Sequence, residues 1–302
     1  LIHVNVVGCA LFAAISGSSA ATVATVGKMS IPELRKRNYP EKILLGSLAG
    51  SGTLGLLIPP SIILIIYGVA VQESIAKLFI AGIIPGIMIA LIFMSYVIIW
   101  SLINKKSMPK IIEEYSFFEK IKRSKQLLPV IILILAVIGS IYTGIATATE
   151  AASLGVVGAL ILSYFQKSLT LKTFKSSLLG ATKTSCMIAF ILAGSTFLSL
   201  AMGFTGLPRN LALWIQNMDL SPYVLIFVLM IFYIILGMFL DGISAVVLTM
   251  AIIEPMIRQA GFDMIWFGIF LVIVVEMAQI TPPVGFNLFV LQGMAKKDMG
   301  YI

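Results

Sequence analysis

The chain of 302 residues is 59% hydrophobic and 11% charged, and its formal net charge is +8. Soluble domains carry about 25% charged residues, so this composition excludes an ordinary soluble protein. Because apolar runs of about 20 residues recur, we predict an all-α polytopic membrane protein embedded in a lipid bilayer. The basic residues lie in loops between apolar runs, where anionic lipid attracts them, and nucleic acid is therefore not an expected partner.

The chain begins with an apolar arm at residues 1–15, followed by a stretch of Gly, Ser, Thr and Ala. A lipid-facing helix does not need such residues at its centre, but they permit non-helical dihedral angles and close backbone approach. The return arm, residues 20–26, is too short for the roughly 30 Å hydrocarbon core. We therefore predict a helical hairpin that turns around inside the membrane.

The next apolar stretch, residues 43–71, is interrupted twice. The first interruption contains Gly52 and Gly55, and the second is the double proline Pro59-Pro60. Two adjacent prolines remove two backbone donors, which breaks a helix rather than only bending it. The sequence thus predicts a spanning helix that is broken near the midplane.

The middle of the chain is typical of spanning helices joined by charged loops. We expect spans at residues 78–103, 126–145, 147–165 and 176–203. The segment 206–219 mixes Trp214 with polar residues and predicts an interfacial helix.

The pattern of the first unit returns near the C-terminus. An apolar arm at 223–240 leads to the break Asp241–Ser244 and to a return arm at 245–257, which is about 13 residues or roughly 20 Å of helix. The apolar stretch 264–294 is then broken at Pro282-Pro283. We predict a second hairpin inside the membrane and a second broken helix.

Charge placement predicts the orientation of these segments, because cytoplasmic loops are enriched in Lys and Arg. Of the 21 basic residues, 17 lie in the segments 28–42, 104–125, 167–175 and 296–297. With these segments in the cytoplasm, the first hairpin enters the membrane from inside and the second from outside. A double proline follows each tip glycine at nearly the same distance, Pro59 after Gly17 and Pro282 after Gly242. The sequence therefore predicts an inverted-topology repeat, which is typical of secondary transporters.

Helices broken at the midplane expose backbone groups that must line a cavity or bind a ligand. Carbonyls and hydroxyls suit a hard cation such as Na⁺, and amide ends suit an anionic substrate. The oxygen donors in the first unit are Ser16, Ser18, Ser19, Thr22, Gly52, Thr53 and Gly55. Those in the second are Gly242, Ser244, Thr249, Thr281, Gly285 and Asn287.

Two simpler interpretations stay open at this point. Small residues also serve ordinary helix packing in membranes, although four clusters in two matched pairs favour binding. Asp241 could ligate or only stabilise the second tip, and Glu276 could lie near the site or be a paired structural acid. We assign the substrate to the polar groups Ser18, Ser19, Thr22, Ser61, Asp241 and Asn287.

The sequence contains no catalytic set. It has no Ser-His pairing beyond the lone His3, no metal-ligand spacing and no phosphate loop, so we do not expect an enzyme. A channel is the alternative to a transporter, because broken helices also line pores.

Four stretches together resemble the large membrane subunit of TRAP (tripartite ATP-independent periplasmic) transporters, the DctM/SiaM-like family. They are FAAISGSSAATVATVG at 12–27, GTLGLLIPPS at 52–61, YTGIATATEAA at 142–152 and TPPVGFNLF at 281–289. The resemblance implies an elevator-type secondary transporter that imports organic acids with two or more Na⁺ ions. The overall sequence, including the residues around Glu276, is most similar to the sialic-acid branch of the family. The resemblance therefore implies sialic acid as the substrate, with a C4-dicarboxylate as the second choice.

The resemblance also implies partners, location and ion ligands. The partners are a small membrane subunit, separate or fused upstream, and a periplasmic binding protein, at the bacterial inner membrane. The family has further helices before its first hairpin, so the chain is expected to be the C-terminal part of the subunit. The implied Na⁺ ligands are Ser16, Gly17, Ser18 and Ser19 with Gly52, Thr53, Gly55 and Pro59, and Gly242 and Ser244 with Thr281, Val284 and Gly285.

The predicted organisation has four parts. Residues 1–71 and 223–302 form the two halves of a transport domain, residues 72–175 form connecting scaffold helices, and residues 176–222 form a spanning helix with the interfacial helix.

Overall fold

The computed structural model describes residues 2–109, 125–206, 210, 213 and 221–302. Within these ranges every regular element is a helix, which confirms the predicted fold class at the level of an all-helical protein. The chain divides into two compact units. Unit 1 contains residues 1–109 and 195–302, and unit 2 contains residues 110–194.

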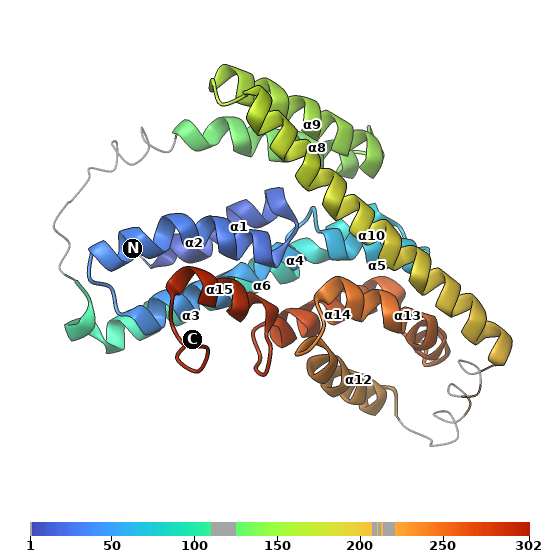
Figure 1. The fold of residues 1–302 in the computed structure, drawn as a ribbon. Coiled ribbons are helices and arrows are strands. Elements are labelled where there is room, and N and C mark those ends of the chain that lie inside the picture. The colour runs from blue at the N-terminus through green and yellow to red at the C-terminus, as the bar shows by residue number, and fades with distance from the viewer. Residues whose placement is uncertain (1, 110–124, 207–209, 211–212, 214–220) are drawn as a thin grey trace. The chain divides into compact units, whose positions relative to one another are not determined.

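The first half of unit 1 is a hairpin followed by a broken helix (Figure 1). Helices α1 (His3–Ser16) and α2 (Ser19–Lys36) are joined through Gly17 and Ser18 alone. The broken helix consists of α3 (Glu41–Gly52), α4 (Leu54–Leu57) and α5 (Ile62–Ala70), and its two parts are bent by 40° at the double proline. Helix α6 (Ile75–Ile103) and the short turn η1 (Lys105–Ser107) follow.

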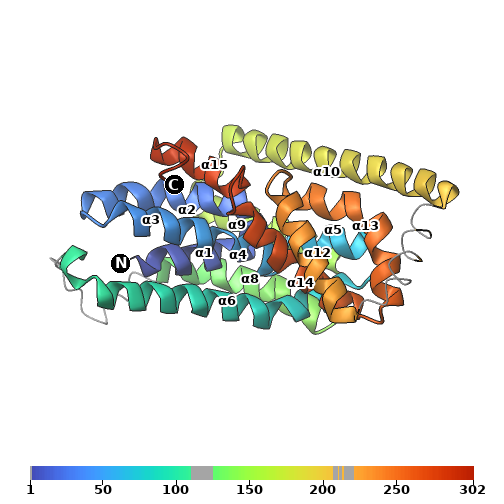
Figure 2. The same ribbon diagram turned by 90° about the horizontal axis from the view of Figure 1, so that it is seen from below.

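The second half of unit 1 repeats this order. Helices α12 (Pro222–Gly237) and α13 (Gly242–Gln259) form a hairpin, and α14 (Met264–Gln279) and α15 (Phe286–Ala295) form the broken helix. Figures 1 and 2 show that α15 lies beside α2 and α3 at one end of unit 1, whereas α5 lies beside α13 at the other end.

The two halves share their register closely. Adding one constant offset to the residue number converts Pro32, inside α2, to Pro255, inside α13. The same offset converts the double proline at 59–60 to the one at 282–283. The same offset carries the first residue of α3 onto the first residue of α14. The two halves thus share the order of their helices and the spacing of these residues.

The return arm of the first hairpin is longer than predicted. Helix α2 has 18 residues and ends at Lys36, so the prediction that it ends near residue 26 is wrong. Val26, Ile31 and Leu34 are buried in a cluster with α3 and α15, while Lys28 and Arg35 are exposed. The helix continues through the charged segment because its apolar face still packs against the core.

The return arm of the second hairpin is also longer than predicted. Helix α13 starts at Gly242, ends at Gln259 and is long and apolar enough to cross a membrane. Asp241 caps its first turn, and an ion pair between Glu254 and Arg258 extends its last turn. Arm length therefore does not show that either hairpin turns around inside the membrane.

The other predicted spans largely coincide with helices of the structure. In the part of the chain that the structure describes, four helices are long and apolar enough to cross a membrane: α6, α9 (Ala148–Phe165), α10 (Leu171–Thr205) and α13. The bent pair formed by α3–α4 and α5 is a fifth candidate within the described residues. Helix α8 (Leu128–Tyr142) has only 15 residues and is shorter than the predicted span 126–145.

Unit 2 contains a short 3₁₀ turn, η2 (Lys125–Leu127), then α8, α9 and the first part of α10. Glu150 belongs to a capping box with Thr147 at the start of α9. The predicted interfacial helix with Trp214 and most of the loop 104–125 lie outside the described residues.

Candidate functional site

The tip of the first hairpin rests on the double-proline break. Gly17 has φ = +59°, and a Cβ there would lie only 2.8 Å from the carbonyl oxygen of Pro60, so glycine is required. The Gly17 carbonyl accepts a hydrogen bond of 3.3 Å from the backbone N–H of Ile62, the first residue of α5. The tip and the break are thus joined through their backbones.

Three oxygens gather at this tip. The Thr22 hydroxyl lies 2.8 Å from the Ser18 carbonyl and 2.8 Å from the Ser16 hydroxyl, and the Ser16 hydroxyl lies 3.2 Å from the Ser18 carbonyl. A Cβ on Gly55 would lie 2.7 Å from both the Ser18 carbonyl and the Thr22 hydroxyl, so α4 approaches these oxygens closely. We call these three oxygens the tip triad.

The tip of the second hairpin rests on the second break in the same way. The N–H of Gly285, which has φ = +53°, donates a hydrogen bond of 3.3 Å to the carbonyl of Met238. Asp241 caps α13: its carboxylate accepts from the N–H groups of Ile243 and Ser244 at 3.1 and 3.2 Å and also from the Ser244 hydroxyl. In this structure Asp241 therefore stabilises the tip.

The two tips meet at the C-terminal end of α14. The hydroxyl of Ser19, the first residue of α2, donates a buried hydrogen bond of 2.9 Å to the Gln279 side chain. A Cβ on Gly242, the first residue of α13, would lie 2.9 Å from the amide nitrogen of the same side chain. Gln279 thus contacts the start of both return arms.

A buried acid lies one turn before Gln279. Glu276 is only 3% exposed, and its carboxylate accepts a hydrogen bond from the backbone of Leu57 at the end of α4. Its other oxygen, Oε1, has no hydrogen-bond partner among the described residues. Glu276 therefore links α14 directly to the first break and not to a basic partner.

The remaining predicted donors of the first unit are near this region but use their hydroxyls locally. Thr53 donates to the carbonyl of Gly50 at 2.7 Å, and Ser61 donates to the carbonyl of Leu56 and caps α5. Gly52 faces Val23, because a Cβ there would overlap the Val23 side chain. Pro59 is buried beside them.

The hydroxyls of the second unit are bonded within their own turn or hairpin. Thr281 donates to the Met277 carbonyl at 2.6 Å. Thr249 donates to the Ala245 carbonyl at 2.7 Å, and its hydroxyl also lies 2.6 Å from the Tyr233 hydroxyl on α12. Of the predicted second set, Gly285 contacts the tip through its backbone, and the half-buried Val284 directly precedes it. The structure therefore gathers hydroxyl and carbonyl oxygens more closely at the first tip than at the second.

Asn287 is completely buried in the first turn of α15, and both polar atoms of its side chain lack a partner among the described residues. Buried amides are normally hydrogen-bonded, so this side chain is available to a ligand. Gln279 is not among the residues predicted from the sequence, although a glutamine in an apolar run two residues before Thr-Pro-Pro is a visible signal.

Long apolar helices together with interrupted helices are typical of helical membrane transporters. The family model described as tripartite ATP-independent periplasmic transporter, DctM component, matches residues 1–302. The chain belongs to this family, and it is a component of a transporter rather than an enzyme.

Several characterised relatives are similar over nearly the whole chain. The C4-dicarboxylate TRAP transporter large permease protein of Pseudomonas aeruginosa is 34% identical over 297 residues, which are 98% of this chain and 69% of that protein. The isethionate TRAP transporter permease protein DctMQ of Oleidesulfovibrio alaskensis is 33% identical, covering 95% of this chain and 45% of that protein. The 2,3-diketo-L-gulonate TRAP transporter large permease protein of Escherichia coli is 32% identical, with 97% and 69% covered.

Proposed function

We propose that this chain couples the import of an organic acid anion to the entry of Na⁺, with the two hairpin tips and the two helix breaks forming the transport site. The observation that carries this proposal is the tip triad of Ser16, Ser18 and Thr22. Oxygen ligands of a hard cation such as Ca²⁺ lie at roughly 2.3–2.6 Å. Three oxygens separated by 2.8 to 3.2 Å can all lie at that distance from one centre.

The anion is expected at the amide ends of the half-helices. The short helices α5 and α15 both begin at a break, and their N-termini carry partial positive charge. Asn287 in the first turn of α15 has two unused polar atoms, and Ser61 stands at the start of α5. Together with Ser18, Ser19, Thr22 and Asp241 at the tips, these residues are our proposed substrate contacts.

The substrate that we propose is a small organic acid. The sequence resemblance favours sialic acid as the substrate, and this identification stays a prediction. The names of the relatives point to C4-dicarboxylates, isethionate and 2,3-diketo-L-gulonate. All of these are acids that are anionic at neutral pH, which suits positively charged helix N-termini.

The movement that we propose is of the elevator type, with the two halves of unit 1 carrying the site across the inner membrane. Support comes from the shared register of the halves and from the Lys- and Arg-rich loops, which on the cytoplasmic side give the halves opposite orientations. We further propose a small membrane subunit and a periplasmic binding protein as partners. One relative carries the name DctMQ, which is consistent with a fused small subunit.

The experiment that tests this proposal uses the complete large subunit, reconstituted with its small subunit in liposomes. The periplasmic binding protein, loaded with each of a panel of radiolabelled organic acids, is added outside. We expect uptake of one acid only when Na⁺ is directed inward. Uptake that persists without Na⁺ but with a proton gradient or ATP would reject Na⁺ coupling, and fast flux without the binding protein or any gradient would indicate a channel.

A further inference from the structure

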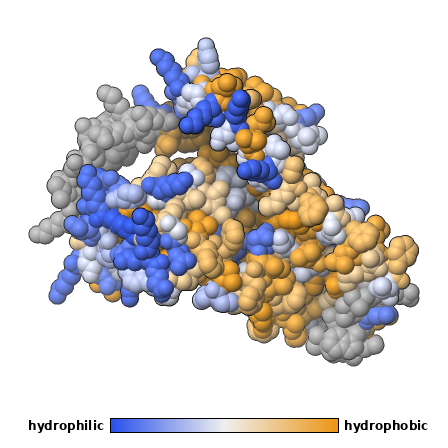
Figure 3. Space-filling view, in the orientation of Figure 1, coloured by the Kyte–Doolittle hydropathy of each residue, from blue (hydrophilic) through white to orange (hydrophobic). Residues whose placement is uncertain are grey.

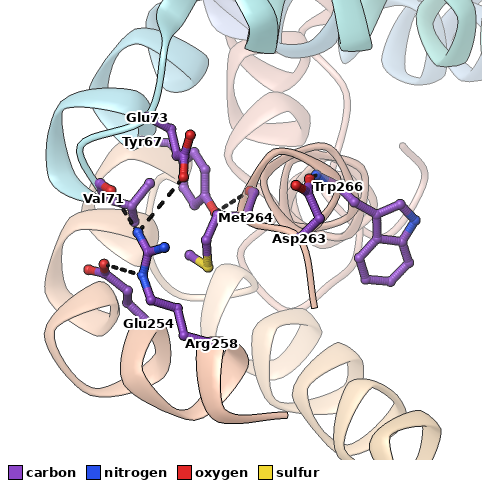
Figure 4. A network of polar contacts seen from close by, with 8 residues as sticks. All are labelled: Tyr67, Val71, Glu73, Glu254, Arg258, Asp263, Met264 and Trp266. Atoms are coloured by element: carbon purple, nitrogen blue, oxygen red, sulfur yellow. Dashed lines mark hydrogen bonds and ion pairs between the residues drawn. The ribbon is translucent and has the colours of Figure 1, made fainter. Parts of the chain in front are cut away.

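Arg258, near the end of α13, binds the first half of unit 1 (Figure 4). One of its terminal nitrogens donates a hydrogen bond of 3.1 Å to the carbonyl of Val71 and lies 3.9 Å from the Glu73 carboxylate. Its Nε donates at 2.9 Å to Glu254 on its own helix. Val71 is the C-cap residue that directly follows α5, so a hairpin of the second half caps the short helix of the first half.

Arg35, near the end of α2, makes the reciprocal contact. A terminal nitrogen donates a hydrogen bond of 2.9 Å to the carbonyl of Ala295, the last residue of α15. The same guanidinium pairs with Glu41, whose other oxygen lies 3.3 Å from the Lys297 ammonium. Figure 3 shows hydrophilic side chains gathered around the ends of α2, α3 and α15. Here a hairpin of the first half caps the short helix of the second half.

The donors of these two contacts occupy equivalent positions, and the acceptor Ala295 lies one residue beyond the position equivalent to Val71. Arg35 and Arg258 are related by the same offset in residue number that relates the two halves. Each capped carbonyl is followed directly by a residue with positive φ, Gln72 at 56° and Lys296 at 53°. Two independent surface contacts would not be expected to share both the donor position and a positive φ at the residue directly after the acceptor.

We infer that Arg35 and Arg258 are positioning residues that close a ring of four helices around the two tips. The N–H of Ile62 joins α5 to the tip at Gly17, and Val71 at the other end of α5 joins Arg258 of α13. The N–H of Gly285 then joins the second tip to the start of α15, and Ala295 at its far end joins Arg35 of α2. The ring thus runs from α2 through the first tip to α5 and from α5 to α13. It continues from α13 through the second tip to α15, which contacts α2 again.

The ring matters because α5 and α15 have only 9 and 10 residues. Helices this short are marginal by themselves, and their last four carbonyls have no partner within the helix. A guanidinium at the C-terminal end satisfies such a carbonyl and complements the helix dipole. Each arginine therefore holds a half-helix whose opposite end is bonded to a hairpin tip. The value of this ring for transport rests on the proposed function, whereas the ring itself does not.

Hydrogen exchange measured by mass spectrometry on the complete subunit in lipid nanodiscs tests the ring without any ion gradient. With Arg258→Gln, we expect amides of α5 to exchange at least about fivefold faster, whereas those of α15 change little. With Arg35→Gln, we expect the reverse. The effect thus crosses from the mutated half to the other half, which a purely local role of either arginine does not produce.

Lys28→Gln is the matched control, because Lys28 is an exposed cation on α2 with no polar partner among the described residues. It should leave exchange in α5 and α15 unchanged. If Arg258→Gln yields no folded protein, Arg258→Lys serves instead, since one ammonium cannot replace both the Nε contact with Glu254 and the contact with Val71. Unchanged exchange in α5, or faster exchange confined to α13, would overturn the inference.

Uptake assays on the same variants then measure what the ring does for transport. Loosening either half-helix should lower the apparent Na⁺ affinity about threefold or more. If exchange shows the crossed pattern but uptake never depends on Na⁺, the ring stands and the proposed coupling ion is wrong. If uptake depends on Na⁺ and exchange shows no crossed pattern, the ring is wrong and the proposed function stands.

Discussion

Ser19 and Gln279 are 260 residues apart in the sequence, yet the Ser19 hydroxyl donates a buried hydrogen bond of 2.9 Å to the Gln279 side-chain oxygen. Ser19 starts the return arm of the first hairpin, and Gln279 ends the first part of the second broken helix. This one contact therefore connects the two halves of unit 1 at the start of α2 and the end of α14.

Removing either partner should destabilise the protein, and removing both should cost less than the sum. Gln279→Ala or Ser19→Ala leaves a buried polar group unpaired, which costs about 1–3 kcal/mol. Because the residues are in direct contact, we expect a coupling energy of about 1 kcal/mol between them. Thermal unfolding midpoints of the two single variants and the double variant in one detergent measure it. Additive shifts would show that the hydrogen bond does not connect the halves.

Thr22→Val tests the tip triad, because valine keeps the branched shape and removes one oxygen. If the triad binds Na⁺, the Na⁺ concentration for half-maximal uptake should rise about tenfold or more, since one lost ligand to a cation costs at least about 1.4 kcal/mol. Thr25→Val, one turn later on α2 and half-buried, is the matched control and should leave this concentration unchanged. An equal effect of both substitutions would count against the triad.

The interrupted units were predictable because their signals are local. A double proline breaks a helix wherever it occurs, and the Ser- and Gly-rich stretch before it contains the glycine that the turn at Gly17 requires. The arm lengths were not predictable by counting apolar residues. Helices α2 and α13 continue past Lys28 and Glu254 because one face stays buried while the charges lie on the other.

The roles of individual polar residues were harder to predict, because they depend on contacts between segments far apart in the chain. Ser18, Ser61 and Asp241 were selected as ligand contacts, and in this structure each caps the helix that follows it. Gln279 and Arg258 are absent from the predicted set. The apolar run around Gln279 signals a buried polar group but does not identify its partner Ser19, and nothing near Arg258 in the sequence signals its contact with Val71. The constant offset between the halves makes the second arginine visible once the first is known.

The buried acid Glu276 should be needed as a hydrogen-bond acceptor for the backbone of Leu57. Glu276→Ala leaves that N–H buried and unpaired, which should destabilise the protein by about 1–3 kcal/mol. Glu276→Gln keeps an acceptor oxygen at the same place and should recover most of the lost stability. Thermal midpoints of the two variants at pH 7 measure the difference. If alanine and glutamine shift the midpoint equally, the contact with Leu57 does not stabilise the fold.

Glu41 gives the contact between α2 and α15 a pH dependence. Partial burial acts to raise the pKa of the Glu41 carboxyl, but the hydrogen bonds and charges of Arg35 and Lys297 outweigh it, and the pKa is lowered below its ordinary value of 4.5. A lowered pKa in the folded state means that this stabilisation is fully present above the ordinary pKa and is lost as the pH falls through the folded-state pKa. Glu41→Gln should therefore lower the thermal midpoint at pH 7 and have little effect near pH 3.

The matched control for this prediction is Glu33→Gln. Glu33 also has a lowered pKa, through its hydrogen bond with Arg37, but this pair lies on one exposed helix face and is screened by solvent. We expect a smaller shift of the midpoint at pH 7 for Glu33→Gln than for Glu41→Gln, because only Glu41 binds the arginine that reaches α15. A pH-independent shift for Glu41→Gln would mean that its charge does not support the contact between Arg35 and Ala295.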